Sequence, residues 1–146
     1  VKTIVADSTV DTNTDTVFSC GVQENPKIRE ICAFGVADRL AIEMIASYGM
    51  PVGAEVFQTC VWIGRFVETW LHSPHHNDDH SSWQLVYRKD CKLHICGSPR
   101  AKDGNIRQAL IDKLGPVGTK KTPGPLYGVK SHIWAALAVA ATALKL

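Results

Sequence analysis

Residues 38–47 read Asp-Arg-Leu-Ala-Ile-Glu-Met-Ile-Ala-Ser, an apolar run with one carboxylate, Glu43, in its middle. Turn-forming residues bound this run, with Gly35 before it and the segment 49–53 after it. Such a run predicts a buried strand. A lone buried carboxylate costs on the order of several kcal/mol, so Glu43 needs a partner. The alternative is a strand edge at which Glu43 reaches water or Arg39.

Working outward from this strand, apolar side chains recur every three or four residues between positions 56 and 71, which predicts an amphipathic helix. Its apolar residues are Val56, Cys60, Ile63, Val67 and Leu71, with Trp62, Phe66 and Trp70 alongside. The pattern also predicts a hairpin from 1–6 and 17–22, helices at 25–34, 103–114 and 131–144, and a strand at 83–87. This order predicts an α/β fold in a single domain, residues 1–146.

Composition excludes several classes of protein. With 45% hydrophobic and 21% charged residues, the chain is typical of a globular domain and not of a disordered one. Its longest apolar stretch, at 133–144, is about 12 residues, short of the roughly 20 that span a membrane. The first residues lack the pattern of a signal peptide, so we expect an intracellular protein. Five cysteines without a C-x-x-C pair argue against a disulfide framework or a zinc cluster and predict free thiols.

The charges are polarised along the chain. Residues 1–87 hold 5 Lys/Arg against 11 Asp/Glu, a balance of −6, whereas residues 88–130 hold 10 Lys/Arg against 3 Asp, a balance of +7. An acidic half and a basic half in one domain suit a metal site beside a phosphate-binding surface. Solvated faces that differ in charge by chance are the alternative.

A second carboxylate, Asp7, closes the expected first strand. If that strand neighbours the one that holds Glu43, the two side chains start about 5 Å apart, a separation that like charges tolerate poorly without a cation between them. Mg²⁺ prefers such carboxylate ligands. As an alternative, Asp7 is a turn former, and Asp11 and Asp15 compete with it.

Several stretches resemble a known family. Leu-Ala-Ile-Glu-Met-Ile at 40–45, followed by the turn at 49–53 and a long helix, resembles the second catalytic strand and next helix of RuvC-type Holliday junction resolvases. Ile-Trp-Ala-Ala-Leu-Ala-Val-Ala at 133–140 resembles their last helix, and residues 90–112 and 124–129 resemble phage-encoded members. The resemblance covers residues 38–144. It implies an RNase H-like fold, a mixed five-stranded sheet flanked by helices.

The resemblance also implies an activity and a site. It implies a homodimeric endonuclease that cleaves Holliday junctions or other branched DNA by two-metal hydrolysis, with Mg²⁺ or, in its place, Mn²⁺. Asp7, Glu43 and His132 would be the catalytic residues and metal ligands. Two departures put this in doubt: Ser8-Thr9 replaces the family's Pro-Gly-like turn after Asp7, and Ala135 replaces one carboxylate of the last helix.

Basic residues of the second half are the expected contacts to the DNA backbone. They are Arg88, Lys89, Lys92, Arg100, Lys102, Arg107, Lys120, Lys121 and Lys130. Asp103 is a weaker candidate ligand, because a first-turn acid of a helix has a structural reason to be there. The His- and Asp-rich stretch 72–80 lacks a standard ligand spacing and predicts an exposed loop.

Two other functions remain open at this point. One is that of a structure-selective DNA-binding protein that does not cleave, and the other is that of an RNase H-like enzyme that acts on RNA or RNA–DNA hybrids.

Overall fold

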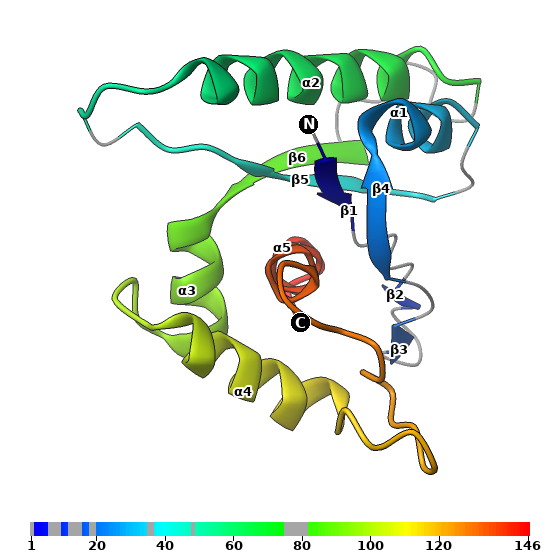
Figure 1. Cartoon of the computed structure of the whole chain (residues 1–146), viewed down its shortest axis with the longest axis vertical. Coiled ribbons are helices and arrows are strands. Elements are labelled where there is room, and N and C mark those ends of the chain that lie inside the picture. Colours follow the sequence, from blue (N-terminus) through cyan, green and yellow to red (C-terminus); the bar gives the residue numbers. More distant parts are fainter. Residues whose placement is uncertain are drawn as a thin grey trace.

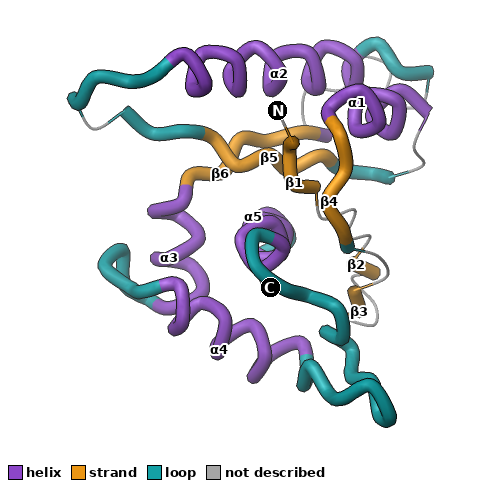
Figure 2. Tube along the Cα trace, in the orientation of Figure 1, coloured by secondary structure: helices purple, strands orange, loops and turns teal. Residues whose placement is uncertain are grey.

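Three pairs of strands and five helices make up the part of the chain that the structure describes (Figures 1 and 2). The structure is a computed structural model; it describes residues 2–5, 10–11, 16–17, 20–34, 37–47, 49–74 and 82–146, with backbone alone before residue 20. The strands are β1 (Lys2–Val5), β2 (Val10–Asp11), β3 (Thr16–Val17), β4 (Gly21–Glu24), β5 (Leu40–Met44) and β6 (Trp83–Tyr87). The helices are α1 (Asn25–Phe34), α2 (Ala54–Leu71), α3 (Arg88–Cys96), α4 (Asp103–Leu114) and α5 (Ile133–Ala143).

Strands β5 and β6 form a parallel pair in which Ile42 lies opposite Leu85 and Glu43 opposite Val86. Parallel strands need a crossover connection, which α2 supplies here. Side chains alternate between the two faces of a strand. Accordingly Leu40 and Ile42 pack against the core cluster under α1 and α2, whereas Ala41 packs against the cluster around α5. The pair therefore separates two cores.

The smaller core lies between the β5–β6 pair and helices α1 and α2. Its buried residues are Ile28 and Cys32 of α1 and Phe66 and Trp70 of α2. The indole Nε1 of Trp70 donates a buried 2.8 Å hydrogen bond to Oγ of Ser82, so the ring buries its apolar face without losing its polar contact. This packing confirms the predicted apolar face of the helix.

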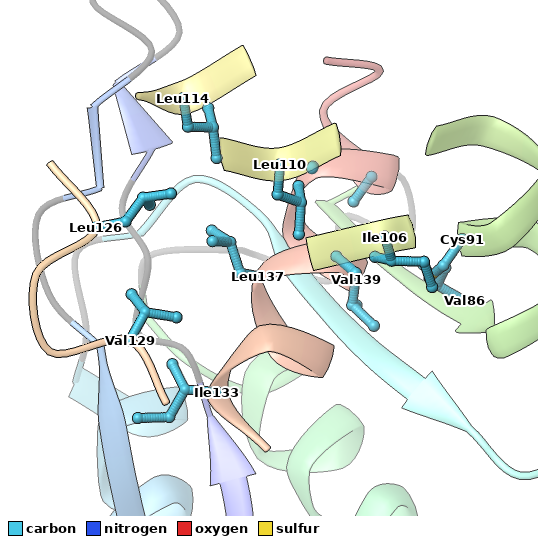
Figure 3. Close-up of a cluster of buried hydrophobic side chains, with 13 residues drawn as sticks. Val86, Cys91, Ile106, Leu110, Leu114, Leu126, Val129, Ile133, Leu137 and Val139 are labelled. Atoms are coloured by element: carbon cyan, nitrogen blue, oxygen red, sulfur yellow. The ribbon is translucent and has the colours of Figure 1, made fainter. Parts of the chain in front are cut away.

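The larger core surrounds α5, which Figure 1 shows end-on between α3, α4 and the strands. Figure 3 shows Leu137 of α5 facing Leu110 of α4, with Leu126 nearby. The small side chains of Ala138 and Ala141 are buried, which lets α5 lie close to its neighbours. The helix predicted at 131–144 is thus confirmed as Ile133–Ala143.

The described part of the chain does not show the expected mixed five-stranded sheet. Its strands pair only as β1–β4, β2–β3 and β5–β6, and the first two pairs are antiparallel. The hairpin predicted from 1–6 and 17–22 corresponds to the pair β1–β4, which joins Lys2 to Glu24 and Val5 to Gly21. α5 contacts β1 as well as β5 and β6, so a helix links the two main pairs.

The prediction of a buried strand at 38–47 is wrong in two respects: the strand is shorter than expected, and it is only partly buried. The strand covers Leu40–Met44, its apolar residues are partly buried, and Glu43 is exposed. Among the described strands, β5 pairs with β6 alone. An apolar run in the sequence could not predict this, because it does not show how many neighbouring strands cover a strand's edges.

Two expectations from composition have structural counterparts. All five cysteines are free thiols, of which Cys32 and Cys91 are buried. Within the described residues, no helix is both long and apolar enough to cross a membrane.

Candidate functional site

Glu43 is the candidate site residue that the structure places most clearly. It shares a face of β5 with Ala41, because the two are one strand period apart. Ala41 and Val86, the register partner of Glu43, both belong to the core around α5. The exposed carboxylate of Glu43 is therefore held at the margin of this core, on the α5 side of the strand pair.

The buried thiol of Cys91, in the first turn of α3, lies close enough to several charged groups, including Glu43, for them to shift its pKa. Burial raises the pKa of Cys91, a hydrogen bond with Thr142 of α5 lowers it, and the charges of Glu43 and Asp90 raise it while that of Arg88 lowers it. These groups all lie near Cys91, where β6 passes into α3. A carboxylate, a guanidinium and the C-terminal end of α5 converge there.

Arg88 is the strongest local link at this junction. Its Nη2 donates a 2.7 Å hydrogen bond to Oδ1 of Asp103, which holds the start of α3 against the start of α4. Its Nη1 is buried and, among the described residues, has no hydrogen-bond partner. A buried guanidinium N–H without a partner favours an anion beside it. The sequence indicated Arg88 as a phosphate contact and did not reveal its pairing with Asp103.

Of the other two candidate ligands, the structure describes His132 alone. His132 is the exposed N-cap of α5, and its side chain makes no cap hydrogen bond. It lies about 15 Å along the helix axis from Thr142, the residue that contacts Cys91. Asp7 lies outside the described residues, although β1, which ends at Val5, contacts α5.

The metal site expected from the sequence is therefore incomplete in the described part of the chain. No group of three or more His, Cys, Asp or Glu side chains lies together there in a way that would hold a metal ion. Glu43 and His132 have suitable donor atoms, but they form no such group without a third ligand. Asp103 pairs with Arg88 in the first turn of α4, which supports its structural role.

The basic residues predicted to contact DNA occupy α3, α4 and the segments after each helix. Arg107 of α4 stacks over the ring of Trp134 of α5, with its guanidinium carbon 5.0 Å from the ring centroid. This contact orients Arg107 at the α4–α5 junction. It could not be predicted from the sequence, because the two residues lie on different helices. Exposed members of the set are Lys89, Arg100, Lys102, Arg107, Lys120, Lys121 and Lys130, while Arg88 and Lys92 are partly buried.

The structure describes only the first residues of the His- and Asp-rich stretch 72–80. His72 is exposed at the end of α2 and lies 3.5 Å from a carboxylate oxygen of Glu68. Residues 75–81 lie outside the described residues, so the expected loop stays a prediction.

Comparison with solved structures finds RuvC of Thermus thermophilus, with a TM-score of 0.53, 15% sequence identity, and alignment over 87% of this chain and 75% of that chain. The fold is RuvC-like. No protein-family model matches the sequence, and no curated protein matches it. At this identity the likeness to RuvC shows the fold and not the activity, so the RNase H-like architecture implied by the sequence is supported and its chemistry is a separate question.

Proposed function

We propose that this chain is an endonuclease that cuts branched DNA, including four-way junctions, in the manner of RuvC-type resolvases. The observation that carries the proposal is the place of Glu43. Within a RuvC-like fold, its exposed carboxylate lies on the α5 side of the parallel pair, beside the start of the basic α3–α4 segment. A carboxylate beside a phosphate-binding surface suits hydrolysis of a phosphodiester.

Mg²⁺ is the proposed cofactor, and Mn²⁺ is expected to replace it. Asp7, Glu43 and His132 are the proposed ligands, and Asp7 is the donor that the described residues lack. A divalent ion held by them would activate water and stabilise charge on the phosphate. Of the chain's own residues, Glu43 supplies a negative charge at the strand margin, and the partly buried guanidinium of Arg88 supplies a positive charge that favours a phosphate nearby.

DNA is proposed to lie along the basic side of α3 and α4. The residues 88–130 carry the +7 balance, and most of their Lys and Arg side chains are exposed. Contacts of this kind bind phosphates without reading sequence, so they suit an enzyme that selects a branched shape. Binding should weaken steeply with salt.

A homodimer is proposed because a two-fold symmetric enzyme matches a symmetric four-way junction. The N-terminal half of α2 and the turn before it expose four apolar side chains: Met50, Val52, Phe57 and Val61. Phe57 and Val61 are one helical turn apart and therefore share a face. A second copy of this chain would cover that face.

The second candidate function is a DNA-binding protein of the same fold that does not cleave. Ala135 favours it, because this position of α5 lacks the carboxylate that the family's last helix carries.

A comparison of substrates tests the proposed function. The wild-type protein is incubated with Mg²⁺ and an end-labelled four-way junction, a linear duplex of the same sequence, or an RNA–DNA hybrid. The proposal expects cleavage of the junction alone, at symmetric positions. Cleavage of the hybrid instead would assign the RNase H-like activity, and binding of the junction without cleavage would favour the second candidate.

A further inference from the structure

The segment between α4 and α5 contains a tightly built hairpin, residues 116–125, which we call the lysine hairpin. The backbone N–H of Gly124 donates to the carbonyl of Val117 at 3.1 Å, and that of Thr119 donates to Thr122 at 2.9 Å. An antiparallel bridge joins Gly118 to Pro123 between these two bonds. The chain therefore doubles back on itself through this bridge and the two flanking hydrogen bonds.

Two glycines make this close approach possible. Gly118 has φ +74°, a conformation that other residues rarely adopt, and a Cβ there would collide with the backbone of Gly124. A Cβ on Gly124 would in turn collide with the carbonyl oxygen of Pro116. Pro116 and Pro123 also have fixed φ angles, which further restricts the backbone of the lysine hairpin. The hairpin is therefore specified by its sequence.

The tip of the hairpin is a closed turn that presents two lysines. The hydroxyls of Thr119 and Thr122 are hydrogen-bonded at 3.0 Å, and the N–H of Thr122 donates to the hydroxyl of Thr119 at 3.2 Å. Lys120 and Lys121, between the two threonines, are both exposed. The turn thus holds two ammonium groups at adjacent positions.

The base of the hairpin is anchored in the core around α5. Leu114 at the end of α4 is 6% exposed, and beyond the hairpin Leu126 and Val129 are 0% and 5% exposed. Figure 3 shows all three pointing toward α5. A tip that is fixed at both ends by buried residues loses little freedom on binding a partner.

The stretch of sequence that contains the hairpin carries charges of one sign. No Asp or Glu follows Asp112 in the sequence, whereas residues 113–146 hold five lysines. No ion pair involves Lys120 or Lys121 within the described residues. Two neighbouring unpaired cations on a fixed turn suit a partner with closely spaced negative charges, as on a DNA strand.

We propose that the lysine hairpin is a preformed finger that contacts the phosphate backbone of one duplex arm of a branched DNA. This inference rests on the proposed function and adds a contact region to it. Figure 1 shows the orange hairpin beyond α4, at the end of the molecule opposite α2. In a dimer formed through α2, the two fingers would therefore lie at the far ends and reach separate arms.

The test measures binding of a fluorescent four-way junction by anisotropy at several KCl concentrations. Lys120→Ala/Lys121→Ala is compared with Lys27→Ala/Arg39→Ala, which removes the same charge from exposed positions on α1 and just before β5, outside the basic segment 88–130. The finger pair should weaken binding roughly tenfold and reduce the slope of log Kd against log salt by roughly 2. An effect no larger than that of the control pair would overturn the finger.

A third variant, Thr119→Ala/Thr122→Ala, separates shape from charge. It removes the side-chain bonds across the turn and keeps both lysines, so affinity should fall about threefold with an unchanged salt slope. Wild-type affinity in this variant would contradict a preformed finger.

Cleavage of the same junction is followed in parallel to separate the two proposals. Cleavage with no effect of the finger variants overturns the finger alone. Binding without cleavage, weakened by Lys120→Ala/Lys121→Ala, supports the finger and overturns the nuclease. A wild-type protein that does not bind the junction overturns both.

Discussion

Nη2 of Arg88, at the start of α3, lies 2.7 Å from Oδ1 of Asp103, at the start of α4. The guanidinium is partly buried and the carboxylate is largely exposed, with 29% and 75% of their side-chain surfaces accessible. The pair ties together two helices that carry most of the predicted DNA contacts. Asp103 also neutralises part of the positive charge of Arg88, which would otherwise attract a DNA phosphate.

Asp103→Asn should therefore raise the affinity for DNA. Removing a negative charge beside Arg88 favours phosphate binding, and we expect affinity to rise about two- to fivefold at low salt. The loss of the exposed ion pair should lower the free energy of unfolding by less than about 1 kcal/mol. Anisotropy titration and urea unfolding measure the two effects. The control is Asp112→Asn on the same helix, where Gln108 donates to the carboxylate; an equal gain in both variants would contradict a specific role of Asp103.

The helices were the part of the fold that the sequence predicted best. α2, α4 and α5 lie within two residues of the ranges expected at 56–71, 103–114 and 131–144, because long apolar periodicities depend little on tertiary context. α3 was not assigned, since its nine residues are mostly polar and carry a weak apolar face. The described residues form three separate strand pairs and do not show the five-stranded sheet, because strand pairing depends on contacts between distant segments, which a single sequence does not reveal.

Leu137→Ala should strongly destabilise the fold. Leu137 is 1% exposed at the centre of α5, and truncation would leave a cavity facing Leu110. We expect a loss of about 2 to 5 kcal/mol in the free energy of unfolding, measured by urea denaturation. Leu93→Ala, at a position that is 51% exposed, is the matched control and should cost far less. Similar losses in the two variants would mean that α5 is not the centre of the core.

Cys32 should make stability fall at alkaline pH. Burial raises the pKa of the Cys32 thiol to about 11 from 9.0. The folded state therefore holds its proton more tightly, so its contribution is complete below pH about 9 and is lost as the pH rises toward about 11. The difference in unfolding free energy between wild type and Cys32→Ala should shrink by roughly 2 kcal/mol over that window. Cys60→Ala, which removes a partly exposed thiol, is the control; the same trend in both variants would contradict this account.

Phe57 and Val61 should determine whether the chain self-associates. Both are more than half exposed, at 62% and 54%, and share a face of α2. Phe57→Ser/Val61→Ser should convert a dimer to a monomer by sedimentation velocity, because it removes the apolar surface that a second copy would bury. Gln58→Ser, an exposed polar position on the same helix, is the control. If wild type is monomeric at every concentration, or if the double variant stays dimeric, this interface is wrong.

The candidate site was predictable in its residue types and not in its geometry. Glu43 stood out because it interrupts an apolar run, yet the argument that it must be buried failed, since the strand leaves this side chain exposed. Arg107 was assigned to DNA from its charge, while its stacking on Trp134 depends on how α4 and α5 cross. Asp7 and residues 75–81 lie outside the described residues, so their predicted roles stay predictions.

The most direct measurement of the central claim is cleavage of an end-labelled four-way junction by the wild-type protein, Glu43→Gln and the control Glu68→Gln, each in Mg²⁺ and in Mn²⁺. Glu68 is exposed on α2, away from the α5 side of the strand pair. We expect paired symmetric nicks from wild type and Glu68→Gln, and a rate lower by on the order of a hundredfold or more in Glu43→Gln, with junction binding unchanged. Cleavage by Glu43→Gln at the wild-type rate, or a wild-type protein that binds the junction and cuts it with neither metal, would contradict the account.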